Sequence, residues 1–495
     1  MFIFALLAIV AVGYFIVKKV HAAAAIFFVA VLLLMISAAF GMGEHRTVEI
    51  TSSGNAFYDQ LLVIEKIFSA RFAGIGMAIL VLFGFVSYMR HIGADAKTVV
   101  FLSRPLQRMR GSYWLVPIGF ILGNILSLVV PSASALSLLL IATLLPALVA
   151  AGLTPLTVGA VVVTVSTIMP TPLEAGLIQG AKLTGMPISE YVFGHVALAT
   201  IPTLLLTAFV HMWWQRRCDR KEAARADNAD GATAQSLPPA VERTANDGTD
   251  MAGDTPPTTV TADEPSAAVK EALERAAGLP GFYAVLPLLP LLLIVISATA
   301  ARLGWTNFEA EIVPATVVSL FIAIMIEMVR HRAIRQPVQA LGDFFQGIGE
   351  GAAGVVSLIV AAAILVEGIT QLGVISMLTD ATEHSQGAAA LVILIFVAST
   401  ALLATLTGSG VAPYFAFSEV VPSLAAETGV LPVRMLNCIW GTANIMRQAS
   451  PVCAAVLIGA GAIKVNPVLL VKRTAVPMVA AMVLNVVFSF LFIHA

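Results

Sequence analysis

The chain has 495 residues, of which 59% are hydrophobic and only 12% are charged, and its mean hydropathy is +0.93. Soluble domains carry about 25% charged residues, so this composition excludes a soluble globular protein and predicts an all-α, multi-pass protein of a lipid bilayer. The formal net charge of −1 does not indicate a charged macromolecular partner, and no nucleic-acid partner is expected.

The first 71 residues are predicted to contain two membrane spans and an external loop. The spans are the apolar stretches at residues 2–17 and 22–39, and a polar loop follows at residues 41–71. No basic region precedes the first stretch and no small-residue cleavage site follows it, which is typical of a retained span and not of a signal peptide.

Residues 72–216 form a predicted first repeat. Its elements are a span, a basic amphipathic arm on the cytoplasmic membrane face, two apolar stretches joined by a polar tip, an interrupted span and a clean span (residues 72–89, 90–110, 115–130 with 137–150, 157–180 and 192–214). Neither apolar stretch alone crosses a hydrocarbon layer of about 30 Å comfortably. We therefore expect a re-entrant hairpin whose tip, at residues 131–134, stops inside the membrane.

Residues 217–278 differ completely in composition. They are rich in Ala, Asp, Glu, Thr and Pro, and we expect a disordered cytoplasmic linker with a short helix at residues 266–277. Two connecting spans follow within residues 279–335. Residues 336–495 then repeat the first order of elements: a span, an arm, an apolar pair with a polar tip, an interrupted span and a last span (residues 351–368, 372–386, 388–405 with 412–425, 433–463 and 474–493).

The two halves correspond in spacing as well as in order. Pro155 and Pro432 are 277 residues apart, as are Met169 and Met446 (432 minus 155, and 446 minus 169). Paired, interrupted helices in an internal duplication are typical of a secondary transporter built from inverted repeats. The sequence therefore predicts about ten transmembrane helices plus two re-entrant hairpins.

The positive-inside rule gives the orientation. Most of the 28 Lys and Arg residues lie in five segments that we place in the cytoplasm (residues 18–19, 90–110, 215–280, 330–335 and 464–473). Both termini are then outside, and the two hairpins enter from opposite sides, as inversion requires.

The interrupted span at residues 433–463 is the strongest indication of function. It carries Arg447, and a charge at the bilayer centre costs about 2.5–3.5 kcal/mol on insertion scales. The hairpins and interrupted spans each place a half-helix N-terminus, with roughly +0.5 charge, near the membrane midplane. The guanidinium adds a fork suited to a carboxylate. These features together predict a pocket for a small mono- or dicarboxylate.

The predicted site residues come from the tips and interruptions. Those assigned to substrate binding are Ser132, Ser134, Thr407, Gly408, Ser409, Gly410, Asn444, Arg447, Gln448 and Ser450. Those assigned to ion coupling are Glu174, Thr171 and Glu419. The three cysteines and eight histidines show no spacing typical of a metal site, and no nucleophile–base pair or nucleotide motif is present. We expect neither a metal, nor a cofactor, nor an enzyme.

Several assignments have a structural alternative. The tip hydroxyls are also typical of local hydrogen bonding in tight turns. Asn444 is suited either to capping the first half-helix or to binding substrate. Arg447 is also suited to an internal ion pair with Glu174 or Glu419. We interpret Glu174 as a proton-coupling carboxylate, with a counter-ion to Arg447 as the alternative.

Six motifs outside the linker carry a family resemblance: YMRHIGA at residues 88–94, IATLLP at 141–146, HMWWQR at 211–216, LTGSG at 406–410 with Ala412 and Pro413, RQASP at 447–451 and VKRTAVP at 471–477. With these motifs the chain resembles the DcuC-type anaerobic C4-dicarboxylate carriers of the ion-transporter superfamily. The resemblance implies exchange, uptake or efflux of succinate, fumarate or malate across a bacterial inner membrane, coupled to H⁺ (or Na⁺). It also implies a homodimeric elevator in which a transport domain moves against a scaffold domain.

Two alternatives to a C4-dicarboxylate carrier remain open. One is a carrier of another small organic anion. The other is an anion channel, or a membrane receptor whose site only senses its ligand. A channel shows continuous conductance, whereas a carrier shows saturable counterflow.

Overall fold

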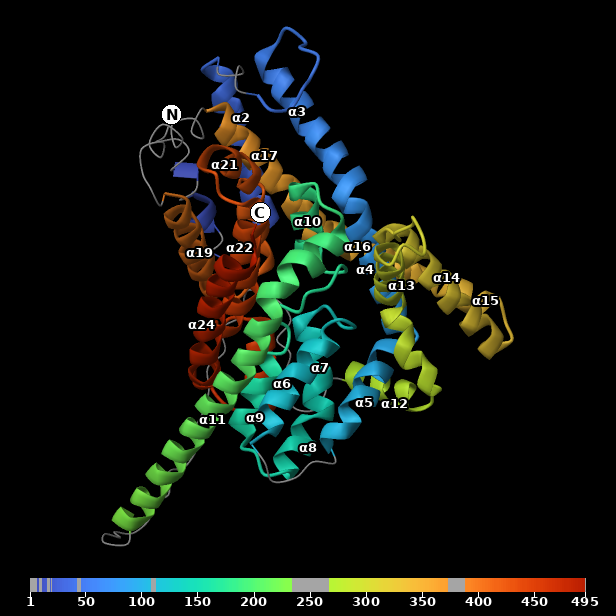
Figure 1. The fold of residues 1–495 in the computed structure, drawn as a ribbon, viewed down its shortest axis with the longest axis vertical. Coiled ribbons are helices and arrows are strands. Elements are labelled where there is room, and N and C mark those ends of the chain that lie inside the picture. Colours follow the sequence, from blue (N-terminus) through green and yellow to red (C-terminus); the bar gives the residue numbers. More distant parts are fainter. Residues whose placement is uncertain are drawn as a thin grey trace, which may run out of the picture.

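The protein is described by a computed structural model, drawn in Figure 1. It describes residues 7–8, 11–15, 18, 20–41, 46–107, 113–233, 267–372 and 388–494. Within these residues all secondary structure is helical. The second predicted arm and the centre of the predicted linker lie outside the described residues, as does much of the first predicted span.

Nine helical segments in the described part are long and apolar enough to cross a membrane: Ala22–Ala39, Ala56–His91, Glu190–Ala224, Gly281–Arg302, Ile312–His331, Arg335–Gln371, Ala390–Thr407, Pro432–Ala462 and Pro467–Phe492. These differ from the predicted spans at two described places. The first interrupted span consists of helices too short to be counted. The first arm of the second hairpin is long enough to cross by itself.

A long kinked helix follows α2 (Ala22–Ala39) and consists of α3 (Ala56–Arg71), the π-helical segment η2 (Phe72–Gly76) and α4 (Met77–His91). The external loop predicted at residues 41–71 is therefore wrong from Ala56 onward. Asn55 explains where the helix begins, because its side-chain oxygen accepts hydrogen bonds from the backbone N–H groups of Phe57 and Tyr58 at 3.0 and 3.2 Å.

A second long kinked helix corresponds to the first. It consists of α15 (Arg335–Gln339), α16 (Leu341–Gly351), the π-helical segment η5 (Ala352–Val356) and α17 (Ser357–Gln371). The π-helical segments η2 and η5 begin 280 residues apart (352 minus 72). Both long helices thus carry the same interruption at corresponding positions.

The two long helices cross in opposite directions, with α4 against α16. A Cβ atom added to Gly76 would lie 3.2 Å from Val356, and one added to Gly84 would lie 2.7 Å from Phe344. A Cβ atom added to Gly347 would meet the backbone of Gly84 at 2.9 Å. Glycine at these positions therefore lets the two backbones approach closely, as small residues do at helix crossings in membranes.

Each half also contains a hairpin and a broken helix. In the first half, α6 (Leu115–Leu126), α7 (Ala133–Thr143) and α8 (Leu145–Ala150) form the hairpin, and α9 (Pro155–Val163) and α10 (Ala175–Thr184) form the broken helix. In the second half, α19 (Ala388–Thr407), α20 (Val411–Ser418) and α21 (Val421–Thr428) correspond to the hairpin, and α22 (Pro432–Met446), the 3₁₀ turn η6 (Arg447–Ala449) and α23 (Ala454–Ala462) to the broken helix.

We name the four irregular segments between these helices as follows. The first tip is residues 127–132 and the second tip is residues 408–410. The first break is residues 164–174 and the second break is residues 447–453. These segments lie at the places where the sequence predicted interruptions.

The last helices of the two halves are α11 (Ala197–Thr233), which continues the π-helical segment η3 (Glu190–Val196), and α24 (Pro467–Phe492). Figure 1 shows the end of α11 projecting away from the helical body, at the side opposite α3. The linker predicted to be disordered from residue 217 is therefore helical up to Thr233. The short helix expected near its end is present as α12 (Ala267–Ala277), followed by η4 (Gly281–Leu288), α13 (Leu289–Arg302) and α14 (Ile312–His331).

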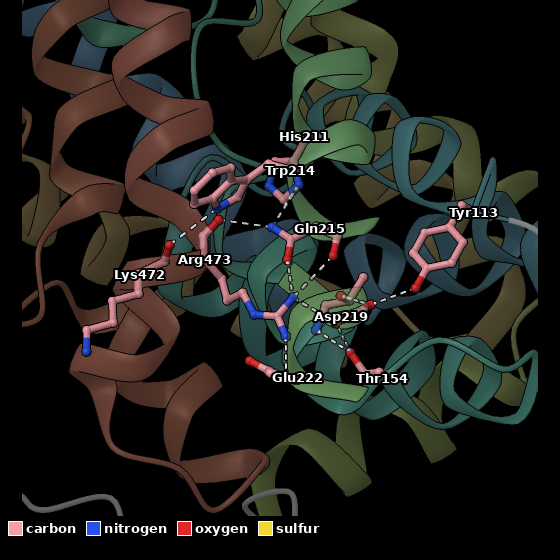
Figure 2. A network of polar contacts seen from close by, with 10 residues as sticks. Tyr113, Thr154, His211, Trp214, Gln215, Asp219, Glu222, Lys472 and Arg473 are labelled. Atoms are coloured by element: carbon pink, nitrogen blue, oxygen red, sulfur yellow. Dashed lines mark hydrogen bonds and ion pairs between the residues drawn. The ribbon is translucent and has the colours of Figure 1, made fainter. Parts of the chain in front are cut away.

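A buried polar network joins α11 and α24 to the first hairpin and the first broken helix (Figure 2). Arg473 of α24 lies 2.7 Å from Asp219 and 2.6 Å from Glu222, both on α11. The Asp219 carboxylate also accepts hydrogen bonds from Tyr113 before α6 and from Thr154 and Thr157 at the start of α9, at 2.8–3.0 Å. Four donors surround this carboxylate, which offsets the cost of burying it.

Helix α5 (Ala94–Gln107) differs from the expected arm on the membrane surface. Its first half is buried, including Asp95 and Lys97, and it packs against η4, α12 and the first hairpin. Thr98 donates a hydrogen bond to the carbonyl of Ala284 in η4 at 2.9 Å, and Arg275 of α12 donates to the carbonyl of His91 at 2.8 Å. Amphipathicity predicted a membrane surface because it does not distinguish lipid headgroups from another helix.

Burial raises the pKa of the Asp95 carboxyl to about 6, above its ordinary value of 3.8. Since the folded protein holds this proton more tightly than the unfolded chain, its stability falls as the pH rises from about 4 through 6. The change of about two units corresponds to roughly 3 kcal/mol at most. We predict that Asp95→Asn raises the thermal unfolding midpoint in detergent at pH 8 and raises it much less at pH 4.5. A lower midpoint at pH 8 would contradict this account.

Candidate functional site

A cavity of about 690 Å³ lies where the two tips, the two breaks and α4 meet. Eight of the predicted site residues line it: Ser132, Ser134, Thr171, Glu174, Gly408, Gly410, Asn444 and Arg447. Thr407, Ser409, Gln448, Ser450 and Glu419 are not among the lining residues. The interruptions from both halves, far apart in the sequence, therefore form one pocket.

The first tip and the first turn of α7 each present one hydroxyl group to the cavity, from Ser132 and Ser134. Ser132 is the N-cap of α7 and accepts a long hydrogen bond, 3.4 Å, from the N–H of Ala135. The hydroxyl oxygens of Ser132 and Ser134 lie 3.2 Å apart. Because these bonds are long and local, both hydroxyls can turn toward a ligand in the cavity.

The second tip packs directly on the second break. Gly408 has φ +69°, and a Cβ atom added there would lie 2.7 Å from the backbone N of Cys453. A Cβ atom added to Gly410 would lie 2.8 Å from the carbonyl oxygen of Ala443. A side chain at either position would collide with the neighbouring backbone, so both positions require glycine.

The hydroxyl of Thr407, the last residue of α19 before the second tip, is used locally. Thr407 donates to the carbonyl of Leu403 at 2.7 Å and accepts from the N–H of Ser409 at 3.2 Å. Thr407 therefore makes the local hydrogen bonds of a tight turn, which was the structural alternative to substrate binding for the tip hydroxyls. Ser409 is half-buried outside the cavity lining.

Three helix N-termini without an acidic cap meet at the cavity, namely those of α7, α20 and α23, and the α10 N-terminus, which also lies there, is capped by Glu174. Their first turns contribute lining residues from 133–135, from 410–411 and from 453–455. Neither α20 nor α23 has a side-chain cap on its free N–H groups. Each N-terminus carries roughly half a positive charge, so the three favour an anion in the cavity.

Arg447 bridges the two breaks. Its Nη2 donates to the carbonyl oxygen of Ser166 at 2.9 Å, and its Nε donates to the carbonyl oxygen of Asn444 at 3.4 Å. The Ser166 carbonyl lies just beyond the C-terminal end of α9, which carries the negative end of the helix dipole. No carboxylate of the described residues lies within 4.0 Å of the guanidinium, and no described group accepts from Nη1. The alternative of a direct ion pair with Glu174 or Glu419 is not what the structure shows.

Glu174 lies opposite, as the N-cap of α10. Its Oε2 accepts hydrogen bonds from the N–H of Leu177 at 2.8 Å and from the indole N–H of Trp440 at 2.9 Å. The carboxylate therefore takes the place of a free anion at the α10 N-terminus. It also faces the cavity, where it is within reach of a ligand or a proton.

The remaining residues of the second broken helix are mostly structural. Gln448 is buried and donates to the Ser166 carbonyl at 2.5 Å, beside Arg447. Ser450 is buried and accepts from the N–H of Val452 at 3.3 Å. Asn444 donates to the carbonyl of Trp440 within its own helix, at 3.2 Å, and also lines the cavity.

Glu419 lies behind the cavity and not in it. Its carboxylate is 2.6 Å from the guanidinium of Arg71 in α3, and it accepts a hydrogen bond from the side-chain amide of Gln179 in α10. Its predicted role in ion coupling is not tested by this geometry.

Several lining residues were missed in the sequence. Ser166 and Trp440, which hold the two charged side chains, belong to the interrupted spans and were hidden among neighbours of similar type. Arg90 and Glu350 are exposed to the cavity from α4 and α16. The sequence could have indicated Glu350, because a carboxylate within a helix long enough to cross a membrane is a candidate functional residue.

Comparison with known proteins gives a consistent result. The family model of the C4-dicarboxylate anaerobic carriers, DcuC, matches residues 2–494. A "Probable anaerobic C4-dicarboxylate transporter DcuC" of Vibrio cholerae is 29% identical over 476 residues, covering 96% of this chain and 94% of that protein. The "Anaerobic C4-dicarboxylate transporter DcuC" of Escherichia coli K12 is 28% identical over 481 residues, covering 97% and 94%.

Among solved structures, the YdaH transporter of Alcanivorax borkumensis is similar over 95% of this chain and 98% of its own. The TM-score is 0.45 and the sequence identity is 15%.

We predict that Gly408→Ala destabilises the protein, because the added Cβ strains the positive φ and collides with the second break. The expected loss of unfolding free energy is about 1–3 kcal/mol. Gly349→Ala is the matched control, since a Cβ atom there meets nothing within 4 Å. Thermal unfolding in detergent measures both, and equal midpoints for the two variants would contradict the proposed packing.

Proposed function

Because the chain belongs to the family of C4-dicarboxylate anaerobic carriers, we propose that it transports a C4-dicarboxylate such as succinate, fumarate or malate across the bacterial inner membrane by secondary active transport. The observation that carries the proposal is the free side of the Arg447 guanidinium in a cavity that also receives three helix N-termini. The relatives are named as transporters, so the protein is a carrier and not an enzyme.

The charges at the pocket match a dianion. Arg447 supplies one positive charge, and three helix N-termini supply at most about 1.5 more. Ionised Glu174 removes one charge, leaving roughly +1.5, whereas protonated Glu174 leaves roughly +2.5. A dianion differs from either sum by about half a charge, so the pocket accommodates it with Glu174 ionised or protonated. Glu174 lines the cavity and can bind a proton there, which supports proton coupling through Glu174, with Na⁺ as the alternative.

We also propose that the tips and breaks move together as the transport domain of an elevator. The contacts of Arg447, Gln448 and the second-tip glycines join the two breaks and the second tip to one another. The first hairpin packs against the second broken helix, where α7 contacts α23. The network around Asp219 then joins them to α11 and α24 (Figure 2). The long helices that cross in opposite directions are suited to the scaffold domain, and this crossing supports inverted repeats. The homodimer remains a prediction of the family resemblance.

Replacing Arg447 tests the site. In proteoliposomes loaded with unlabelled succinate, we expect Arg447→Ala to lower counterflow of labelled succinate at least about tenfold, since a charge-assisted hydrogen bond contributes about 1.5–3 kcal/mol. Arg447→Lys keeps the charge but loses the fork, and an intermediate rate is expected. Arg302→Ala, an exposed arginine at the end of α13, is the control. Full activity of Arg447→Ala would refute its role, and competition by fumarate, malate, aspartate and lactate defines the substrate class.

Replacing Glu174 tests coupling. Glu174→Gln keeps an acceptor for Leu177 and Trp440 but cannot cycle a proton. We expect it to lose uptake driven by a pH gradient while it retains counterflow, with Glu311→Gln as an exposed control. A variant that still responds fully to the pH gradient rules out Glu174 as the coupling group.

A further inference from the structure

A partly buried ion pair, in which the Arg71 side chain is 33% exposed, links α3, in the first long helix, to the end of α20, in the second hairpin. The Nη2 atom of Arg71 lies 2.6 Å from Oε2 of Glu419, and the Glu419 side chain is only 3% exposed. Gln179 of α10 donates to the other carboxylate oxygen. Arg71 and Glu419 are 348 residues apart in the sequence, so this contact exists only because three separate elements meet.

The ion pair lies directly behind one end of the cavity. On α20, Phe415 is the last lining residue and Glu419 follows one turn later. On α10, Ala175 lines the cavity and Gln179 again follows one turn later. On the long helix, lining begins at Ile79, about two turns after Arg71. The long helix, α10 and α20 thus place Arg71, Gln179 and Glu419 together just beyond this end of the cavity.

The other end of the cavity lies toward α5. The lining residues of α4 extend from Ile79 to Arg90, roughly 16 Å along the helix. Arg90, at this end of the α4 lining, is exposed, and Pro287 of η4 also lines the cavity. The cavity is therefore approached from the side of α5, which positive charge assigns to the cytoplasm.

We propose that Arg71, Glu419 and Gln179 form the gate that closes the pocket on the α3 side, and that access from that side requires the ion pair to separate. This rests on the proposed function, because it takes the cavity as the transport pocket. The residues act by holding the second hairpin and α10 against α3, and none of them contacts the cavity.

The gate is not duplicated by the repeat. The residues that correspond to Ala70 and Arg71, 280 positions later, are Glu350 and Gly351, so α16 offers no cation at this place. The side with the ion pair is consequently held more tightly than its counterpart. In the absence of substrate we expect the protein to rest open toward α5.

Cysteine labelling tests the gate without any substrate. The reporter is Ala135→Cys in the first turn of α7, in a protein whose three cysteines are replaced by alanine (Cys218→Ala, Cys438→Ala and Cys453→Ala). A membrane-impermeant maleimide is applied to vesicles of either orientation. In the parent protein, labelling from the α5 side is expected to be at least about tenfold faster than from the α3 side, because the ion pair favours one state.

Variants of the pair decide the outcome. Arg71→Ala and Glu419→Gln should each lower the ratio of the two labelling rates at least about fivefold, and Arg71→Lys should retain it. The exchanged pair, Arg71→Glu with Glu419→Arg, should restore the parent ratio, which a merely structural contribution to stability would not do. Arg302→Ala is the control for general effects.

An unchanged ratio in both single variants overturns the gate. If the single variants do not fold, the exchanged pair decides, because a parent ratio supports the gate and a lost ratio refutes it. Absence of succinate counterflow in the parent protein would instead contradict the proposed function, and the labelling ratio would still test the closure.

Discussion

The pocket depends on how backbone groups are satisfied where helices break inside a membrane. No water is available there, so a free carbonyl or N–H must find a partner within the protein. The carbonyl of Ser166 finds two, Arg447 and Gln448, both from the other half of the chain. The same contact therefore closes the first break, orients the guanidinium and joins the two repeats.

The molecule uses two kinds of contact for two purposes. Polar contacts with directional geometry hold the tips, the breaks, α11 and α24 together. The long helices instead approach one another through Gly84 and Gly347, and an ion pair between Arg71 and Glu419 ties the first of them to the second hairpin. Directional contacts fix the arrangement of the pocket, whereas few of them cross to the long helices. A body that is rigid inside and weakly tied outside is suited to moving as a unit.

Much of the pocket could be predicted because its sequence signals are local. Prolines, hydroxyls and charges within apolar stretches located the tips and breaks to within a few residues, and Arg447 and Glu174 were identified by the cost of placing charge in a membrane. The pairing of Glu419 with Arg71 had no such signal, since it joins positions 348 residues apart. Polar composition wrongly predicted a loop at α3 and disorder at the start of the linker. The Asn55 cap starts the helix at α3, and the start of the linker continues the existing helix α11.

The projecting end of α11 has a mechanical consequence. The helix continues from the network around Asp219 to Thr233 without a described break, and about fourteen residues of helix correspond to roughly 20 Å. A rotation of the pocket-bearing body by ten degrees would move this tip by roughly 4 Å over such a length. The helix is thus suited to act as a lever arm, because its far end would move farther than the pocket itself and offers a place to observe rearrangements of the pocket.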